Sequence, residues 1–115
     1  MAVTPEGKIK KLVKKMLEEF HVMHEIDGFS VSELYEWWPV PGGFGSSSLD
    51  CIIGFRGCML AIETKAPDEK PTPRQKFTIA QIKGAGCMTF VVDGEASCFQ
   101  LREVLRELRD ATDDR

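Results

Sequence analysis

Residues 49–65 read LDCIIGFRGCMLAIETK, two short apolar runs separated by a glycine-containing turn segment. This short separation predicts a β-hairpin with strands over about residues 49–53 and 58–65. Residues two apart on a strand project to the same side, so Glu63 and Lys65 share a face of the predicted sheet.

Asp50 stands at the head of the first strand, and the paired hairpin places it near Glu63 and Lys65. Two carboxylates and an ammonium then meet at one edge of the sheet. Mg²⁺ takes hard oxygen ligands and keeps several waters, so one or two carboxylates plus a substrate phosphate are sufficient to hold it. The metal would acidify a bound water, and a nearby lysine would orient that water or stabilise developing negative charge. An ordinary cross-strand ion pair, worth under about 1 kcal/mol if exposed, is the alternative interpretation.

The sequence before the hairpin predicts a helix and then an acidic, aromatic segment. The first 20 residues have apolar side chains at helical spacing, with Thr4 as a capping hydroxyl and Pro5 at the first helical position. Residues 21–49 hold four acids, no lysine or arginine, and the extended-type run LYEWWPV. A glycine- and serine-rich loop over residues 41–48 leads into the hairpin.

The sequence after the hairpin predicts a helix, a strand and a last helix. Thr72 and Gln75 match a capping box, so a helix is expected from there to about residue 83. Residues 87–92 are a β-rich apolar strand, and a second capping pattern starts the last helix near Ser97. The order helix, three strands, helix, strand, helix predicts an α/β fold with a small mixed sheet, in which the middle helix makes a parallel crossover.

Length and composition limit the class of protein. The chain has 115 residues, of which 43% are hydrophobic, and a formal net charge of -3. These values predict one folded domain, because the chain is too apolar and too weakly charged for disorder. No apolar run approaches the roughly 20 residues that span a bilayer, so we expect no membrane contact and a cytoplasmic location. The four cysteines form no C-x-x-C pair, which favours buried reduced thiols over a zinc site.

The acidic pair and the lysine occur in a pattern that resembles a known superfamily. Asp50, followed thirteen residues later by Glu63-x-Lys65 in an αβββαβ order, is similar to the PD-(D/E)XK nucleases. The segments TPEGKIKKLVKK, GGFGSSSLD, FRGCMLAIETKAPDEKPTPRQ and AGCMTFVVD resemble more closely the VRR-NUC domain, the virus-type replication-repair nucleases common in phage genomes. The resemblance covers residues 4–94 of a single domain over 1–115, with a C-terminal helix over 97–110 beyond it.

The resemblance implies a role for individual residues. Asp50 and Glu63 take the positions of the metal-binding acids, and Lys65 that of the catalytic lysine. Gln75 corresponds to the glutamine of the following helix and Glu6 to the glutamate of the first helix. Their alternatives are the capping box for Gln75 and a favourable interaction with the helix dipole for Glu6. We also expect the Thr64 backbone carbonyl to add a metal ligand. Where the superfamily name expects proline before the aspartate, this chain has Leu49.

The expected activity is Mg²⁺- or Mn²⁺-dependent hydrolysis of DNA, with preference for branched or junction DNA, in phage replication or repair in the host cytoplasm. No small-molecule cofactor is expected. Because one small site cuts one strand, a homodimer paired through residues 21–41 is expected to act on a branched substrate. Basic residues are expected to guide the DNA backbone, namely Lys8, Lys11, Lys15, Lys70, Arg74 and Lys76. The loop residues Gly45, Ser46 and Ser47 would bind a backbone phosphate through their N–H groups. The alternative interpretation is that this loop is simply flexible.

Two other classes of function stay open from the sequence. A non-catalytic DNA-binding or replication-associated module with this fold would bind DNA with a steep salt dependence and cleave nothing. A small protein-interaction domain would bind neither metal nor DNA. Trp37 and Trp38 are adjacent on a predicted strand, so one should cover the core and the other should be exposed, either for a partner or for an unpaired base. His21 and His24 are three residues apart, but no third nitrogen or sulfur ligand lies nearby in the sequence, so a metal site at these histidines is not favoured.

Overall fold

The computed structural model describes residues 3–40 and 48–113. In these ranges the chain forms three α-helices, one 3₁₀ turn and six strands: α1 (Pro5–Leu17), η1 (Glu18–Phe20), β1 (Met23–Ile26), β2 (Phe29–Ser32), β3 (Leu34–Trp37), β4 (Cys51–Phe55), β5 (Cys58–Thr64), α2 (Pro73–Gly84), β6 (Met88–Val92) and α3 (Glu95–Thr112). None of the helices in the described ranges is both long and apolar enough to cross a membrane.

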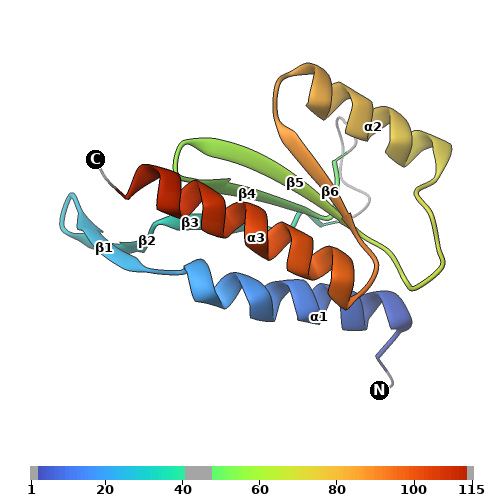
Figure 1. Cartoon of the computed structure of the whole chain (residues 1–115), viewed down its shortest axis with the longest axis horizontal. Coiled ribbons are helices and arrows are strands. Elements are labelled where there is room, and N and C mark those ends of the chain that lie inside the picture. Colours follow the sequence, from blue (N-terminus) through green and yellow to red (C-terminus); the bar gives the residue numbers. More distant parts are fainter. Residues whose placement is uncertain (1–2, 41–47, 114–115) are drawn as a thin grey trace.

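Four strands form one mixed sheet in the order β3-β4-β5-β6. β3, β4 and β5 pair antiparallel, and β6 pairs parallel to β5 after the crossover through α2. The predicted α/β fold with an antiparallel hairpin and one parallel crossover is therefore confirmed (Figure 1).

The β4–β5 hairpin is closed by a two-residue turn, tighter than the four-residue connection expected from the sequence. Cys51 pairs with Ile62, and Phe55 pairs with Cys58. Arg56 and Gly57 both have positive φ, 51° and 80°, which is typical of a type I′ turn. Because a type I′ turn matches the right-handed twist of the paired strands, pairing continues to Phe55, and the first strand spans residues 51–55 instead of the predicted 49–53.

One face of the sheet carries the hydrophobic core. Helices α1 and α3 lie side by side over this face (Figure 1). Alternate residues of the strands point into the layer between sheet and helices, because successive strand residues face opposite sides. The buried cluster comprises Ile9, Val13, Leu17, Phe20, Leu34, Cys51, Ile53, Phe55, Leu60, Ile62, Val92, Cys98, Leu101 and Leu105.

The structure contains an element over residues 21–32 that the sequence analysis did not predict. These residues form the separate β1–β2 hairpin, which projects beyond the C-terminal end of α1 (Figure 1). Asp27 and Gly28, with φ of 53° and 84°, form its turn. The strand residues are exposed or only half-buried, so the hairpin has no alternation of apolar and polar residues by which the sequence would reveal it.

The start of the last helix also differs from the prediction. α3 begins at Glu95 after Gly94, with no side-chain cap. The Ser97 hydroxyl instead donates to the Asp93 carboxylate and accepts from the Asp93 N–H. The expected cap formed by Ser97 is therefore wrong, because this serine bonds backward to the residue before the helix.

Two other sequence predictions of helix starts are confirmed. The Thr4 hydroxyl accepts from the Gly7 N–H at 3.0 Å at the start of α1. The capping box at α2 is complete: the Thr72 hydroxyl accepts from the Gln75 N–H, and the Gln75 side chain accepts from the Thr72 N–H. Both helices thus begin where the sequence predicted.

Candidate metal and nuclease site

The candidate site begins with the pairing of Asp50 and Glu63. Asp50 directly precedes β4, and Glu63 is the penultimate residue of β5. Continuing the hairpin register one pair beyond Cys51 and Ile62 sets Asp50 opposite Glu63. The two carboxyl groups are thus brought together by the register that the tight turn fixes.

Thr64 holds the Asp50 carboxylate in place. Oδ2 of Asp50 accepts from the Thr64 backbone N–H at 2.9 Å and from the Thr64 hydroxyl at 2.6 Å. Thr64 is completely buried, so these donors are fixed by the surrounding core. A carboxylate oriented by two donors keeps its other oxygen available for a cation.

A third acid reaches the pair from α1. Glu6, in the first turn of that helix, contributes one carboxylate oxygen that lies within 4.8 Å of one oxygen each from Asp50 and Glu63. Three carboxylates from distant parts of the sequence therefore converge at one end of the central strands β4 and β5. Carboxylate oxygens are the ligands that Mg²⁺ and Mn²⁺ prefer.

The two paired acids differ strongly in their ionisation. Burial, together with the hydrogen bond to Asp50 and the charge of Asp50, raises the pKa of Glu63 to about 8. Burial also opposes ionisation of Asp50, but hydrogen bonds from Glu63 and Thr64 and the charge of Lys10 hold the pKa of Asp50 below its usual value. At neutral pH without a cation, Glu63 is therefore protonated and Asp50 is ionised.

Two lysines accompany the acids. Lys65 follows β5; it is only 8% exposed, and its backbone N–H donates to the Val92 carbonyl at 2.9 Å. Within residues 3–40 and 48–113 its ammonium has no hydrogen bond or ion pair, although its charge acts to lower the pKa of Glu63. Lys10 Nζ lies 3.9 Å from Asp50 Oδ1. Lys65 is thus a largely enclosed cation at the site, and a bound anion would lower the cost of enclosing it.

Sequence reasoning missed Lys10. The available signal was its position four residues after Glu6, which places both side chains on neighbouring parts of one helix face. By the same helical spacing, Lys8, Lys11 and Lys15 lie more than a quarter turn away from that face, on the exposed side of α1. The lysine row predicted to guide DNA therefore points away from the acid cluster.

The other predicted site residues lie as follows. The Gln75 side-chain oxygen is engaged by the Thr72 N–H at 2.9 Å, so its role at the site stays a prediction. Lys70, Arg74 and Lys76 are exposed around the start of α2. The predicted phosphate loop residues Gly45, Ser46 and Ser47 lie outside the described residues.

The histidines belong to structural networks near β2 and β3. His21 lies 2.7 Å from both Ser32 Oγ and Glu36 Oε1, and His24 lies 2.7 Å from Glu33. Of the described residues that could hold a metal ion, the carboxylates of Glu6, Asp50 and Glu63 form the only group, and it includes neither histidine.

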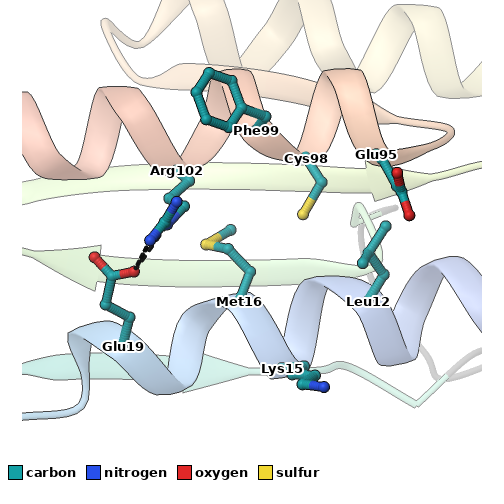
Figure 2. Close-up of a pocket in the computed structure, with 8 residues that line it drawn as sticks. All are labelled: Leu12, Lys15, Met16, Glu19, Glu95, Cys98, Phe99 and Arg102. Atoms are coloured by element: carbon teal, nitrogen blue, oxygen red, sulfur yellow. Dashed lines mark hydrogen bonds and ion pairs between the residues drawn. The ribbon is translucent and has the colours of Figure 1, made fainter.

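A cavity of about 350 Å³ lies elsewhere, between α1 and α3. Figure 2 shows Leu12 and Met16 pointing from α1 toward Cys98 on α3, with Arg102 reaching to Glu19 at 2.7 Å. Lys15 is the only predicted site residue that lines it. This cavity therefore does not coincide with the acid cluster at the end of β4 and β5.

Comparison with known proteins supports the same fold. A solved structure described as a VRR_NUC domain matches with a TM-score of 0.67 and 22% sequence identity, over 87% of this chain and 96% of that chain. At this identity the likeness shows the fold, and it confirms at that level the resemblance expected from the sequence. No protein-family model and no curated protein matches the sequence.

Proposed function

We propose that this protein is a divalent-metal-dependent nuclease that hydrolyses phosphodiester bonds in DNA. The observation that carries the proposal is the convergence of Glu6, Asp50 and Glu63 within 4.8 Å, beside a buried lysine. The fold of a VRR_NUC domain supports it independently. A purely structural ion-pair cluster does not explain why three acids gather at the end of β4 and β5 beside a largely enclosed lysine.

The donor set fits Mg²⁺ or Mn²⁺, because it consists of carboxylate oxygens and lacks sulfur. Asp50 and Glu63 would hold the ion, with Glu6 and the Thr64 carbonyl as further ligands. Such an ion, when bound, supplies Lewis acidity that lowers the pKa of a water and offsets charge on the phosphate. The raised pKa of Glu63 fits this role, since two adjacent carboxylates ionise together only when a cation compensates them.

The remaining chemistry is assigned to this chain's own side chains. Thr64 fixes the orientation of Asp50 through two hydrogen bonds. Lys65 would orient the attacking water or stabilise the negative charge that develops on the phosphate oxygens. Gln75 would assist from the start of α2. The exposed Lys70, Arg74 and Lys76 would contact the DNA backbone outside the reacting phosphate.

We further propose that the substrate is branched or junction DNA and that a homodimer cuts it in the cytoplasm, the host's if the gene is phage-encoded. One chain carries one acid cluster among its described residues, so cutting two strands requires two chains. The β1–β2 hairpin supports pairing through residues 21–41, because Met23, Ile26 and Phe29 on it are exposed. An isolated two-stranded hairpin gains stability when its apolar side chains are covered.

One experiment tests the activity. Duplex, flap and four-way-junction DNA are incubated with the protein, with Mg²⁺, Mn²⁺ or a chelator, and the products are separated on denaturing gels. Cleavage should require the metal and should fall by at least about a hundredfold in Asp50→Asn and Lys65→Ala. Lys83→Ala, which removes an exposed lysine at the far end of α2, is the matched control. Binding without cleavage would instead support the non-catalytic DNA-binding module, and cleavage that survives both substitutions would refute the site.

A further inference from the structure

The face of the sheet opposite α1 and α3 exposes two large aromatic side chains on the edge strand β3. Tyr35 is 68% exposed and Trp37 is 51% exposed. Met59, on β5, is 44% exposed on the same face. Gly54 pairs with both Tyr35 and Met59, so no side chain projects from the sheet between these two residues.

This aromatic face lies close to the acid cluster in the strand register. Trp37 pairs with Ile52, and Ile52 pairs with Ala61. Because alternate strand residues share a side, Glu63 on β5 is on the same side as Ile52, Ala61 and Trp37. One strand spacing across and two residues along place the Trp37 Cα about 8 Å from the Asp50 Cα.

The neighbouring Trp38 has a different environment. It packs against the core, and its indole N–H donates to Glu36 at 2.7 Å. The Lys14 ammonium lies over its ring, 4.8 Å from the centroid, in a cation–π contact. This confirms the sequence prediction that one tryptophan covers the core and the other is exposed. The Trp37 ring makes no ring or cation contact with other described residues, so its face is available to a ligand.

We propose that Trp37, with Tyr35 beside it, stacks on unpaired bases of a DNA strand that runs from the acid cluster across this face. The inference rests on the proposed nuclease function and narrows its substrate class: the preferred DNA carries a single-stranded segment next to the phosphate that is cut. A spacing of about 8 Å is about two stacked-base steps of about 3.4 Å, so the stacked base belongs to a nucleotide close to that phosphate.

The size and chemistry of the exposed patch favour bases over a protein partner. Tyr35, Trp37 and Met59 together expose on the order of 350 Å². A stable protein interface takes about 800 Å² from each partner, which is more than this patch offers, and the exposed residues that support pairing of two chains lie on the β1–β2 hairpin and not on β3. Unpaired bases need only flat aromatic surfaces near a site that engages the backbone, and such stacking tolerates any sequence.

The test compares binding of a base-bearing oligonucleotide with binding of an abasic one. The proteins are wild type, Trp37→Ala, Tyr35→Ala and the control Phe99→Ala, which removes an aromatic side chain that is 56% exposed on α3. Fluorescence anisotropy measures the Kd for a labelled 12-nucleotide single strand and for an abasic strand of equal length, at fixed salt in chelator. Thermal unfolding of each variant establishes that it is folded.

Wild type should bind the base-bearing strand about tenfold more tightly than the abasic strand. Trp37→Ala should lose that difference, Tyr35→Ala should lose part of it, and Phe99→Ala should retain it. Tryptophan emission of wild type should be quenched by the base-bearing strand and not by the abasic strand. In Trp37→Ala, where only Trp38 remains, the quenching should disappear.

Equal affinities of wild type and Trp37→Ala for both strands would overturn the stacking proposal. A change in molar mass by light scattering in Trp37→Ala, without loss of base-dependent binding, would also overturn it and assign the face to a protein contact. These outcomes are separate from the nuclease proposal. Base-dependent binding by a protein that cleaves no DNA would refute the nuclease proposal and support the stacking proposal. Cleavage of DNA with no effect of Trp37→Ala on base-dependent binding would support the nuclease proposal and refute the stacking proposal.

Discussion

Asp50 and Glu63 face each other across the open end of the β4–β5 hairpin, and a hydrogen bond joins their carboxyl groups. The pair therefore carries one proton at neutral pH, with Glu63 as the protonated member. A divalent cation would replace that proton, because it compensates both negative charges at once. Protonation of the Asp50–Glu63 pair, binding of a divalent cation and the free energy of unfolding are therefore linked.

Glu63→Gln should stabilise the metal-free protein increasingly as the pH rises. The pKa of Glu63 is raised to about 8, so between pH 4.5 and 8 the folded state keeps a proton that the unfolded state releases. The stability of wild type therefore falls across this window, and the neutral glutamine avoids the loss. The difference in Tm, variant minus wild type, should grow by at least about 4 °C from pH 4.5 to 8, the shift that about 1 kcal/mol gives in such a domain.

Scanning calorimetry in chelator measures this difference. The exposed Glu69→Gln is the matched control and should leave the pH profile unchanged. A constant difference between Glu63→Gln and wild type at all pH values would contradict the raised pKa.

Mn²⁺ should raise the Tm of wild type more at pH 8 than at pH 6. Glu63 must lose its proton to act as a ligand, so the ion competes with protons more strongly at the lower pH. Binding to the folded state alone stabilises it by about 2.7 kcal/mol when the free ion is at 100 times its Kd. The measurement is thermal unfolding in a Mn²⁺ titration at the two pH values. Asp50→Asn should abolish the shift, and an undiminished shift in that variant would place the ion elsewhere.

Thr64→Val should weaken metal binding and cleavage while leaving the fold intact. The substitution keeps the volume of a fully buried side chain and removes the hydroxyl that donates to Asp50 at 2.6 Å. Loss of a group that orients a metal ligand typically costs about ten- to a hundredfold in metal affinity or activity. The Mn²⁺ Kd by titration calorimetry and the rate of DNA cleavage report the effect.

The control for Thr64→Val is the same substitution at Thr78. That hydroxyl is also buried, and it donates to the Arg74 carbonyl within α2 at 3.2 Å. If Thr78→Val lowers Mn²⁺ affinity as much as Thr64→Val, the effect is a general loss of packing and the assigned role of Thr64 fails.

Lys10→Met should tighten Mn²⁺ binding. Its ammonium lies 3.9 Å from Asp50 and partly neutralises the carboxylate that would bind the ion. Because both side chains are partly exposed, the effect should be modest, about threefold in Kd at low salt. Lys11→Met, which alters the exposed side of the same helix, should leave the Kd unchanged. A weaker Mn²⁺ complex of Lys10→Met would show that Lys10 supports the site by another route.

The sequence was sufficient to predict the centre of the fold. The apolar runs and the short connection identified the β4–β5 hairpin, and the register of a hairpin then placed Asp50 near Glu63. The Thr72 and Gln75 pattern located α2, because a capping box depends only on local backbone geometry. These two features are fixed by contacts between residues close in sequence.

Three features were not predicted, each for a different physical reason. Lys10 was missed because its approach to Asp50 follows from how α1 crosses the end of the sheet. The β1–β2 hairpin was missed because its exposed strands lack the alternation that burial imposes. At the last helix, Ser97 formed a local bond to Asp93 that competes with the expected cap.

The parallel pairing of β5 with β6 has a consequence for the order in which the molecule is completed during synthesis. The hairpin with Asp50 and Glu63 needs only nearby residues, whereas the bond from the Lys65 N–H to the Val92 carbonyl requires the crossover through α2. Contacts of long sequence separation form late, because a larger loop must close first. We therefore expect a nascent chain that ends before β6 to display the two acids without a fixed lysine. Catalytic competence would then arise only after most of the polypeptide has left the ribosome.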